Sequence, residues 1–177
     1  MKKLLLLVAV LFVATTSFAQ DWSVGARVGS GLQAVGKYNY NANNYIEARF
    51  GASWNNPLVY SLRDEADIID FSRSRVMADF TLLHNWKIFT MDWTPSAGEW
   101  FFDAGVGVNV GGLQNYAYVG VAGMARLGFT FYDVPLTLAF DWTPTFGPGI
   151  VYEGKHSDAF FNELGLANLG ISCTFNF

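Results

Sequence analysis

The stretch Trp100–Val110, which reads WFFDAGVGVNV, changes character at every second residue. One face carries large apolar side chains, and the other carries mostly small or polar ones, at Phe101, Asp103, Gly105, Gly107 and Asn109. Successive side chains of a β-strand point to opposite faces, so a period of two predicts a strand with two unlike faces. Tyr116–Phe131 repeats the pattern, with large apolar residues at Val119, Val121, Leu127, Phe129 and Phe131.

Six further segments alternate in the same way, which brings the predicted strands to eight: Trp22–Gly29, Gln33–Tyr40, Asn44–Trp54, Arg73–Trp93, Leu136–Phe146 and Leu166–Phe177. The apolar rows contain no charged residue, whereas the opposite rows are rich in Gly, Ala, Ser and Thr and almost free of Lys. A water-exposed face normally carries many charged side chains, and a lipid-facing one carries none. We expect an all-β fold, a closed antiparallel transmembrane barrel with meander order and apolar rows outside. A soluble lipocalin-like barrel, with the apolar rows inside, is the alternative.

The fourth segment changes phase along its length. Val76, Ala78, Phe80 and Leu82 keep one phase, but Phe89, Met91 and Trp93 keep the other. A β-bulge near His84–Trp86 would shift the phase by one residue. Alternatively the chain turns at His84 and Asn85, and Leu58–Arg63 forms another strand, which gives ten strands.

The connections predict two unlike ends. On one side the expected connections are tight turns, at 41–43, 95–98 and 133–135. On the other side we expect two long loops, Asn55–Ser72 and Gly147–Gly165, together with short connections at 30–32 and 111–115. Aromatic residues flank the tight turns and predict an interfacial girdle: Tyr38, Tyr40, Tyr45, Trp93, Trp100, Phe129, Phe131 and Tyr132.

The composition of the 177 residues excludes several classes of protein. Hydrophobic residues make up 51%, which excludes a disordered chain. The apolar run Leu4–Ala14 is too short for a spanning helix, which excludes a helical membrane protein. A net charge of −4 argues against a nucleic-acid partner, and a single Cys forms no internal disulfide.

The first residues predict a secretory signal. Lys2 and Lys3 precede the apolar run, and Ser17-Phe18-Ala19 follows it, which is the pattern of a cleaved signal peptide. We expect cleavage after Ala19, so that residues 1–19 are the signal and residues 20–177 the barrel domain.

Charged residues at inward positions are nearly balanced in sign. They predict interlocking ion pairs that fill a narrow interior, because eight strands leave room only for packed side chains and buried charges need partners. An open pore is therefore not expected. The candidates are Arg27, Lys37, Arg49, Arg75 and Arg126 with Glu47, Asp79, Asp92, Asp103 and Asp141.

No catalytic, metal or cofactor site is predicted. The only histidines are His84 and His156. His156 and Ser157 are adjacent, so an extended chain points them to opposite faces, unlike the His-x-Ser arrangement of lipid A deacylases. No His or Cys cluster has the spacing of metal ligands.

The two long loops are the predicted interaction surface, because binding residues commonly lie on loops held by a rigid scaffold. Acidic and apolar groups there suit a protein partner, divalent cations that bridge lipopolysaccharide, or folding back over the barrel mouth. The candidates are Asp64, Asp67, Asp70 and Phe71 in one loop and Tyr152, Phe160 and Phe161 in the other.

The chain resembles the small outer-membrane β-barrels of the OmpA/OmpX type. The resemblance rests on the terminal Phe175-Asn176-Phe177 and on the repeat Asp92-Trp93-Thr94-Pro95 and Asp141-Trp142-Thr143-Pro144. It implies an outer-membrane location among lipid and lipopolysaccharide, with Phe175 and Phe177 as the signal for the assembly machinery. We expect a non-enzymatic structural or interaction role in the envelope, with a lipid-modifying enzyme or the lipocalin-like binder as alternatives.

Overall fold

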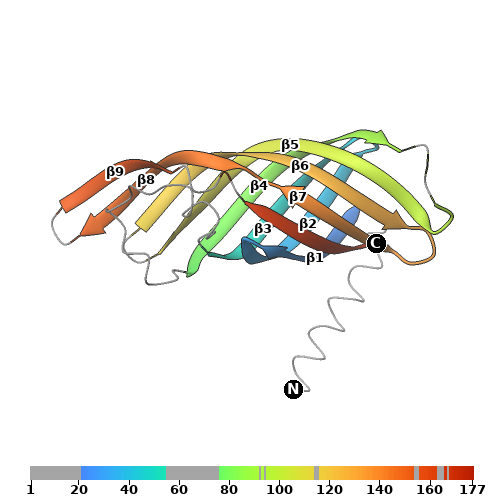
Figure 1. Ribbon diagram of the computed structural model, residues 1–177, viewed down its shortest axis with the longest axis horizontal. Helices are drawn as coiled ribbons and strands as arrows, with labels where there is room; N and C mark the ends of the chain where they lie inside the picture. Colours follow the sequence, from blue (N-terminus) through green and yellow to red (C-terminus); the bar gives the residue numbers. More distant parts are fainter. Residues whose placement is uncertain are drawn as a thin grey trace, which may run out of the picture.

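Every element in the described part of the computed structural model is a β-strand (Figure 1). The structure describes residues 21–54, 76–91, 93, 95–113, 116–153, 156–162, 166 and 168–177, and only the backbone of 113, 116, 151–153 and 156–162. The strands are β1 (Trp22–Gly29), β2 (Gly31–Asn41), β3 (Asn44–Trp54), β4 (Val76–Thr90), β5 (Gly98–Leu113), β6 (Tyr116–Phe131), β7 (Leu136–Trp142), β8 (Thr145–Glu153), β9 (His156–Asn162) and β10 (Leu169–Asn176).

The strands form a closed antiparallel barrel. Neighbours in sequence pair from β1 through β7, and β10 pairs with both β7 and β1, which closes the ring. Both β7 and β8 pair with β6, one after the other, because Pro144 separates them and cannot donate to the ladder. β9 and β10 likewise pair with β8 and β7. The ten elements therefore make eight barrel strands in meander order, as the sequence predicts.

The outside of the barrel is apolar and the inside is polar. Val106 is 53% exposed and Ile171 is 57% exposed on the outer surface. The fully buried large side chains are mainly charged or polar, and three of them are arginines. The described residues contain no helix long and apolar enough to span a membrane. The assignment of apolar rows to the outside is confirmed.

The fourth strand is continuous through His84 and Asn85. It pairs with β5 from Ala78 to Thr90, and the register shifts between Lys87 and Phe89, slightly beyond the predicted bulge. The alternative of a turn at His84 and Asn85 is wrong, and the ten-strand barrel that depends on it is wrong too. Leu58–Arg63 lies outside the described residues.

The predicted loop Gly147–Gly165 is largely a hairpin. β8 and β9 pair from Gly147 with Asn162 to Glu153 with His156. β6 extends far enough to pair with β8, so the barrel wall is longer where the β8–β9 hairpin lies (Figure 1). The prediction of a loop was wrong because β8 continues from Thr145 through Gly147-Pro148-Gly149 to Glu153, where the sequence pattern suggests that the strand ends. The loop Asn55–Ser72 is outside the described residues.

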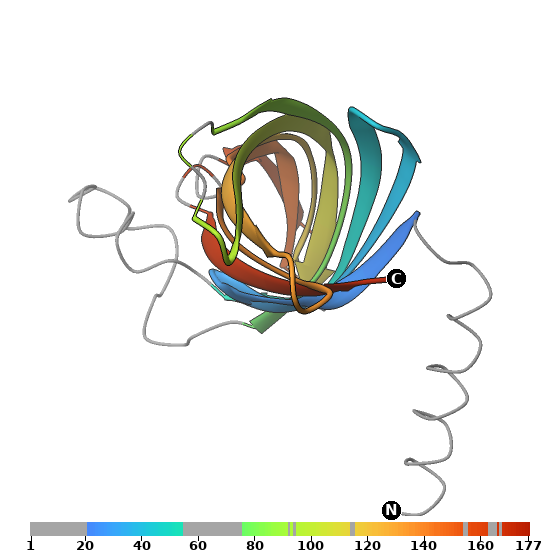
Figure 2. The same ribbon diagram turned by 90° about the vertical axis from the view of Figure 1, so that its right-hand side faces the viewer.

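One end of the barrel, here called the tight-turn end, holds the turns after β2, β4 and β6 together with the C-terminus. Figure 2 looks onto this end, where the strands form a ring. Aromatic rings contact one another on its outer rim, including Trp22 with Tyr38 at 4.7 Å and Trp100 with Phe129 at 5.1 Å between ring centroids. Tyr45 is an exception to the predicted girdle. It is 2% exposed and points inward, because it shares the phase of the inward Glu47.

Candidate functional site

The barrel interior gathers charged side chains from distant segments. Arg27 comes from β1, Glu47 and Arg49 from β3, Arg126 from β6 and Asp141 from β7, each at an inward position of its strand. Strand pairing sets their heights, since Arg126 lies opposite Asp141 in the β6–β7 register. These five residues are called the central ion cluster.

The central ion cluster is tightly bonded. Arg126 donates to both oxygens of Glu47, from Nη1 to Oε2 at 2.6 Å and from Nη2 to Oε1 at 2.8 Å. Arg49 donates from Nε to Oε1 of Glu47 at 2.5 Å and approaches Asp141 at 3.3 Å. Arg27 donates to Asp141 at 2.9 Å. Paired, hydrogen-bonded charges are the form in which ions persist in an interior.

Neutral polar groups extend this network. Arg27 also donates to Gln33 at 3.3 Å and to Asn168 at 3.0 Å, and Arg49 donates to Thr143 at 2.9 Å. All members of the central ion cluster are buried. Guanidinium groups from three strands therefore lie across the interior, with carboxylates between them.

Asp79 forms a second polar group of a different kind. Its oxygens accept hydrogen bonds from Gln33, from Asn109 at 2.8 Å and from Tyr118 at 2.7 Å. Among the described residues it has no cationic partner within salt-bridge distance. In the described part of the chain, neutral donors therefore bind the Asp79 carboxylate, for which the sequence predicts a cationic partner.

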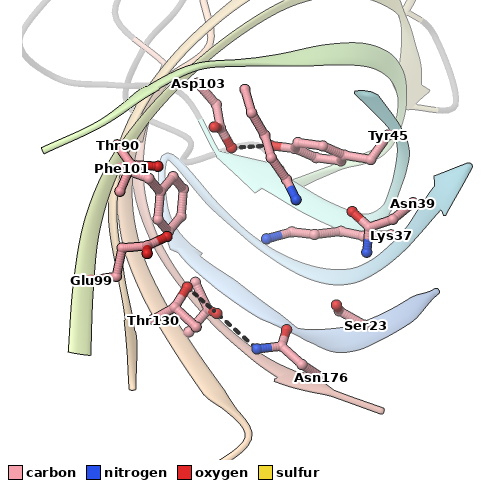
Figure 3. Close-up of a pocket in the computed structure, with 12 residues that line it drawn as sticks. Ser23, Lys37, Asn39, Tyr45, Thr90, Glu99, Phe101, Asp103, Thr130 and Asn176 are labelled. Atoms are coloured by element: carbon pink, nitrogen blue, oxygen red, sulfur yellow. Dashed lines mark hydrogen bonds between the residues drawn. The ribbon is translucent and has the colours of Figure 1, made fainter. Parts of the chain in front are cut away.

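Lys37 and Asp103 lie at the tight-turn end, apart from the ion pairs. Both line a cavity of about 210 Å³ that is enclosed by residues from strands all around the barrel (Figure 3). Asp103 accepts a hydrogen bond from the Tyr45 hydroxyl at 2.6 Å, and this hydroxyl in turn accepts one from Arg126 at 2.9 Å. Tyr45 therefore joins the cavity to the central ion cluster.

Several candidates fall outside what the structure describes. Arg75, Asp92, Asp64, Asp67, Asp70 and Phe71 lie outside the described residues. Tyr152, Phe160 and Phe161 lie on β8 and β9, where only the backbone is described. Phe175 and Phe177 lie at the end of the last strand, with their ring centroids 5.0 Å apart.

Sequence reasoning missed the neutral members of these networks. Gln33, Tyr45, Asn109 and Tyr118 bind charged groups, yet none was a candidate. The signal was available, because each residue has the inward phase of its strand. A search by charge alone leaves out amide and hydroxyl donors such as these.

The histidine whose side chain is described does not lie in the interior. His84 is on the outer surface near the rim, where its Nε2 is hydrogen-bonded to the Tyr40 hydroxyl and its ring contacts Trp86. Within the described ranges, no three His, Cys, Asp or Glu side chains come together to hold a metal ion.

Comparison with protein-family models, curated proteins and solved structures found no match. The indications of function therefore come from the barrel itself. Its two informative features are the inverted distribution of polarity and the ion-filled interior.

Proposed function

We propose that this chain is an outer-membrane β-barrel of the OmpA/OmpX type, with a structural or interaction role in the cell envelope and without an open pore. The observation that carries the proposal is the inverted burial of side chains. Large apolar residues such as Val106 and Ile171 are exposed around the wall, while arginines and carboxylates are buried inside. An apolar surface of this extent is far beyond the patches tolerated on soluble monomers and suits lipid tails.

The same observation weighs against a lipocalin-like binder. Such a barrel needs an apolar interior for its ligand and a solvated outer surface. Here the interior of the described barrel is occupied by the central ion cluster and the Asp79 group, both hydrogen-bonded. An apolar ligand would have to displace these partners and leave charges unpaired, which costs several kcal/mol per ion.

The two ends suggest how the barrel is oriented. Barrels of this class have short periplasmic turns and longer external loops. The tight-turn end, which carries the C-terminus, is thus assigned to the periplasm. The opposite end, with the β8–β9 hairpin, the end of β3 at Trp54 and the start of β4 at Val76, is assigned to the outside, where we place the interaction role with lipopolysaccharide or a protein partner. The assembly machinery would read Phe175 and Phe177 from the periplasmic side.

Two valines test the membrane location. Val108 on β5 is 48% exposed and Val134 in a tight turn is 47% exposed, so a soluble barrel would tolerate a charge equally well at both. In a membrane barrel Val108→Arg places a cation in lipid, at a cost of about 2–4 kcal/mol near the midplane, whereas Val134→Arg stays in water. We expect wild type and Val134→Arg to be recovered in the outer-membrane fraction with heat-modifiable gel migration, and Val108→Arg to lose folded protein.

Other results would contradict the proposal. Detergent-free soluble monomer, or equal behaviour of the two Arg variants, would favour the lipocalin-like alternative. The lipid-modifying alternative is tested on the same purified protein, by analysing lipid A for the removal or addition of acyl chains. A change that depends on the folded protein would replace the structural role with an enzymatic one.

A further inference from the structure

The cavity at the tight-turn end has the features of a binding site. Its walls come from both sides of the barrel, with Lys37 on β2, Asp103 and Glu99 on β5, and Lys87 on β4. Its volume of about 210 Å³ is below the range of about 300–1,000 Å³ usual for drug-sized ligands. Figure 3 shows the Lys37 side chain extending into this space, with Asp103 on the wall above it. A small solute would fit.

Lys37 is a buried cation with few partners. It is 8% exposed, and its ammonium donates only a long hydrogen bond to Thr174 at 3.4 Å. The Tyr45 ring centroid lies 5.9 Å from Nζ. No acidic group in the described ranges lies within salt-bridge distance of it. Since an ammonium has three donors and buried charges need paired partners, Lys37 retains unused donors toward the cavity.

Asp103 is a buried anion with an unused acceptor. It is 2% exposed, and its Oδ2 accepts the hydrogen bond from Tyr45. Its Oδ1 is buried without a partner. A buried acceptor of this kind calls for an explanation, such as a bound donor. The cavity therefore has an unsatisfied acceptor and an underused cation of opposite charge.

The charges of the lining are balanced. Lys87 lies directly across from Asp103 in the β4–β5 register, and Glu99 lies on β5 nearer the rim. An anion would be attracted by the two lysines but repelled by the two carboxylates. A cation would be attracted by the carboxylates but repelled by the lysines. A ligand with one positive and one negative group can place each of them next to a lining group of opposite charge, and it avoids the repulsion that a singly charged ligand meets.

We propose that this cavity binds a small zwitterionic solute, whose carboxylate accepts hydrogen bonds from Lys37 and whose ammonium group donates to Oδ1 of Asp103. Phe101 supplies an apolar wall for the carbon atoms between them. The site goes beyond the proposed function, which only assigns its opening to the periplasm. Binding is measured on the isolated barrel, whereas the membrane location is measured by cell fractionation. Failure of one proposal can therefore be told apart from failure of the other.

The test uses three zwitterions with increasing separation of the charges: glycine, β-alanine and glycylglycine. Acetate, methylammonium and glucose are the single-charge and neutral analogues. Each is titrated into isotope-labelled, folded full-length barrel in detergent micelles while amide NMR shifts are followed. We expect saturable shifts at Lys37 and Asp103 with at least one zwitterion, and an affinity at least about tenfold above that for acetate or methylammonium, since each of these analogues can engage only one of the two charged groups.

Variants separate binding from folding. Lys37→Met and Asp103→Asn are each expected to reduce zwitterion affinity at least about tenfold, whereas Asp133→Asn, in an exposed turn outside the cavity lining, leaves it unchanged. If a cavity variant does not fold, the wild-type shifts and the analogue series still decide. Acetate or glucose binding as tightly as the zwitterions would overturn the proposal, and so would the absence of saturable shifts with all three zwitterions.

Discussion

At the scale of single residues, Glu47 concentrates the electrostatics of the interior. It is fully buried, and its two oxygens accept three hydrogen bonds from Arg49 and Arg126. Taking these groups out of water is costly, and their mutual attraction must offset that cost. Losing one partner of such an ion pair is costly, because it leaves the other group charged and buried.

Glu47→Gln is therefore expected to destabilise the barrel strongly. The amide keeps the shape of the side chain but removes the negative charge that faces two guanidinium groups. Breaking a buried pair costs about 3–5 kcal/mol, which should lower the urea midpoint of the folded barrel.

The control for this variant is Asp133→Asn, which also removes one carboxylate charge but in an exposed turn. It should change stability by less than about 0.5 kcal/mol. Similar midpoints for the two variants would mean that the central ion cluster does not hold the interior together.

At the scale of elements, close packing of neighbouring strands explains the small inward residues. A Cβ added to the inward Gly107 of β5 would lie 1.9 Å from the backbone oxygen of Leu82 on β4. A Cβ added to the outward Gly36 of β2 would meet nothing within 4 Å. The glycines in the two rows thus have different roles.

Gly107→Ala and Gly36→Ala form a matched pair on this basis. The first should cost about 1–3 kcal/mol, because the backbone of β4 has to move away from the new methyl group. The second should be neutral or slightly stabilising, since alanine reduces the conformational freedom of the unfolded chain. The measurement is again the urea midpoint, and equal effects would contradict the proposed close approach of β4 and β5.

Alternation in the sequence predicted much of these elements, since the phase of each strand determines which residues face inward. It placed Arg126 and Asp141 inside and Val106 outside. It did not place Tyr45, which was assigned to the girdle from its closeness to a turn although its phase is inward. It also missed the β8–β9 hairpin, because Gly147-Pro148-Gly149, directly after the predicted strand Leu136–Phe146, looks like the start of a loop. Hydrogen-bond partners such as Gln33 and Asp79 depend on the stagger between strands, which alternation alone does not determine.

At the scale of the whole molecule, the barrel combines a closed wall with a filled interior. The ring from β1 to β10 leaves no open sheet edge around its middle, where each barrel strand has a neighbour on both sides. The central ion cluster crosses the interior between the tight-turn end and the opposite end. The cavity at the tight-turn end therefore ends at Tyr45 and Arg126, which are hydrogen-bonded to each other.

This closure predicts the electrical behaviour of the protein. Eight-stranded barrels leave room only for packed side chains, and ions would have to pass guanidinium and carboxylate groups that already satisfy one another. In planar bilayers, pure folded protein should give no steady, large single-channel conductance, whereas a wide porin in the same bilayer gives one. Detergent without protein is the matched blank, since it separates transient leakage from channels. A stable, uniform conductance from the folded form would mean that the central ion cluster opens in the membrane, and the structural or interaction role would have to give way to transport.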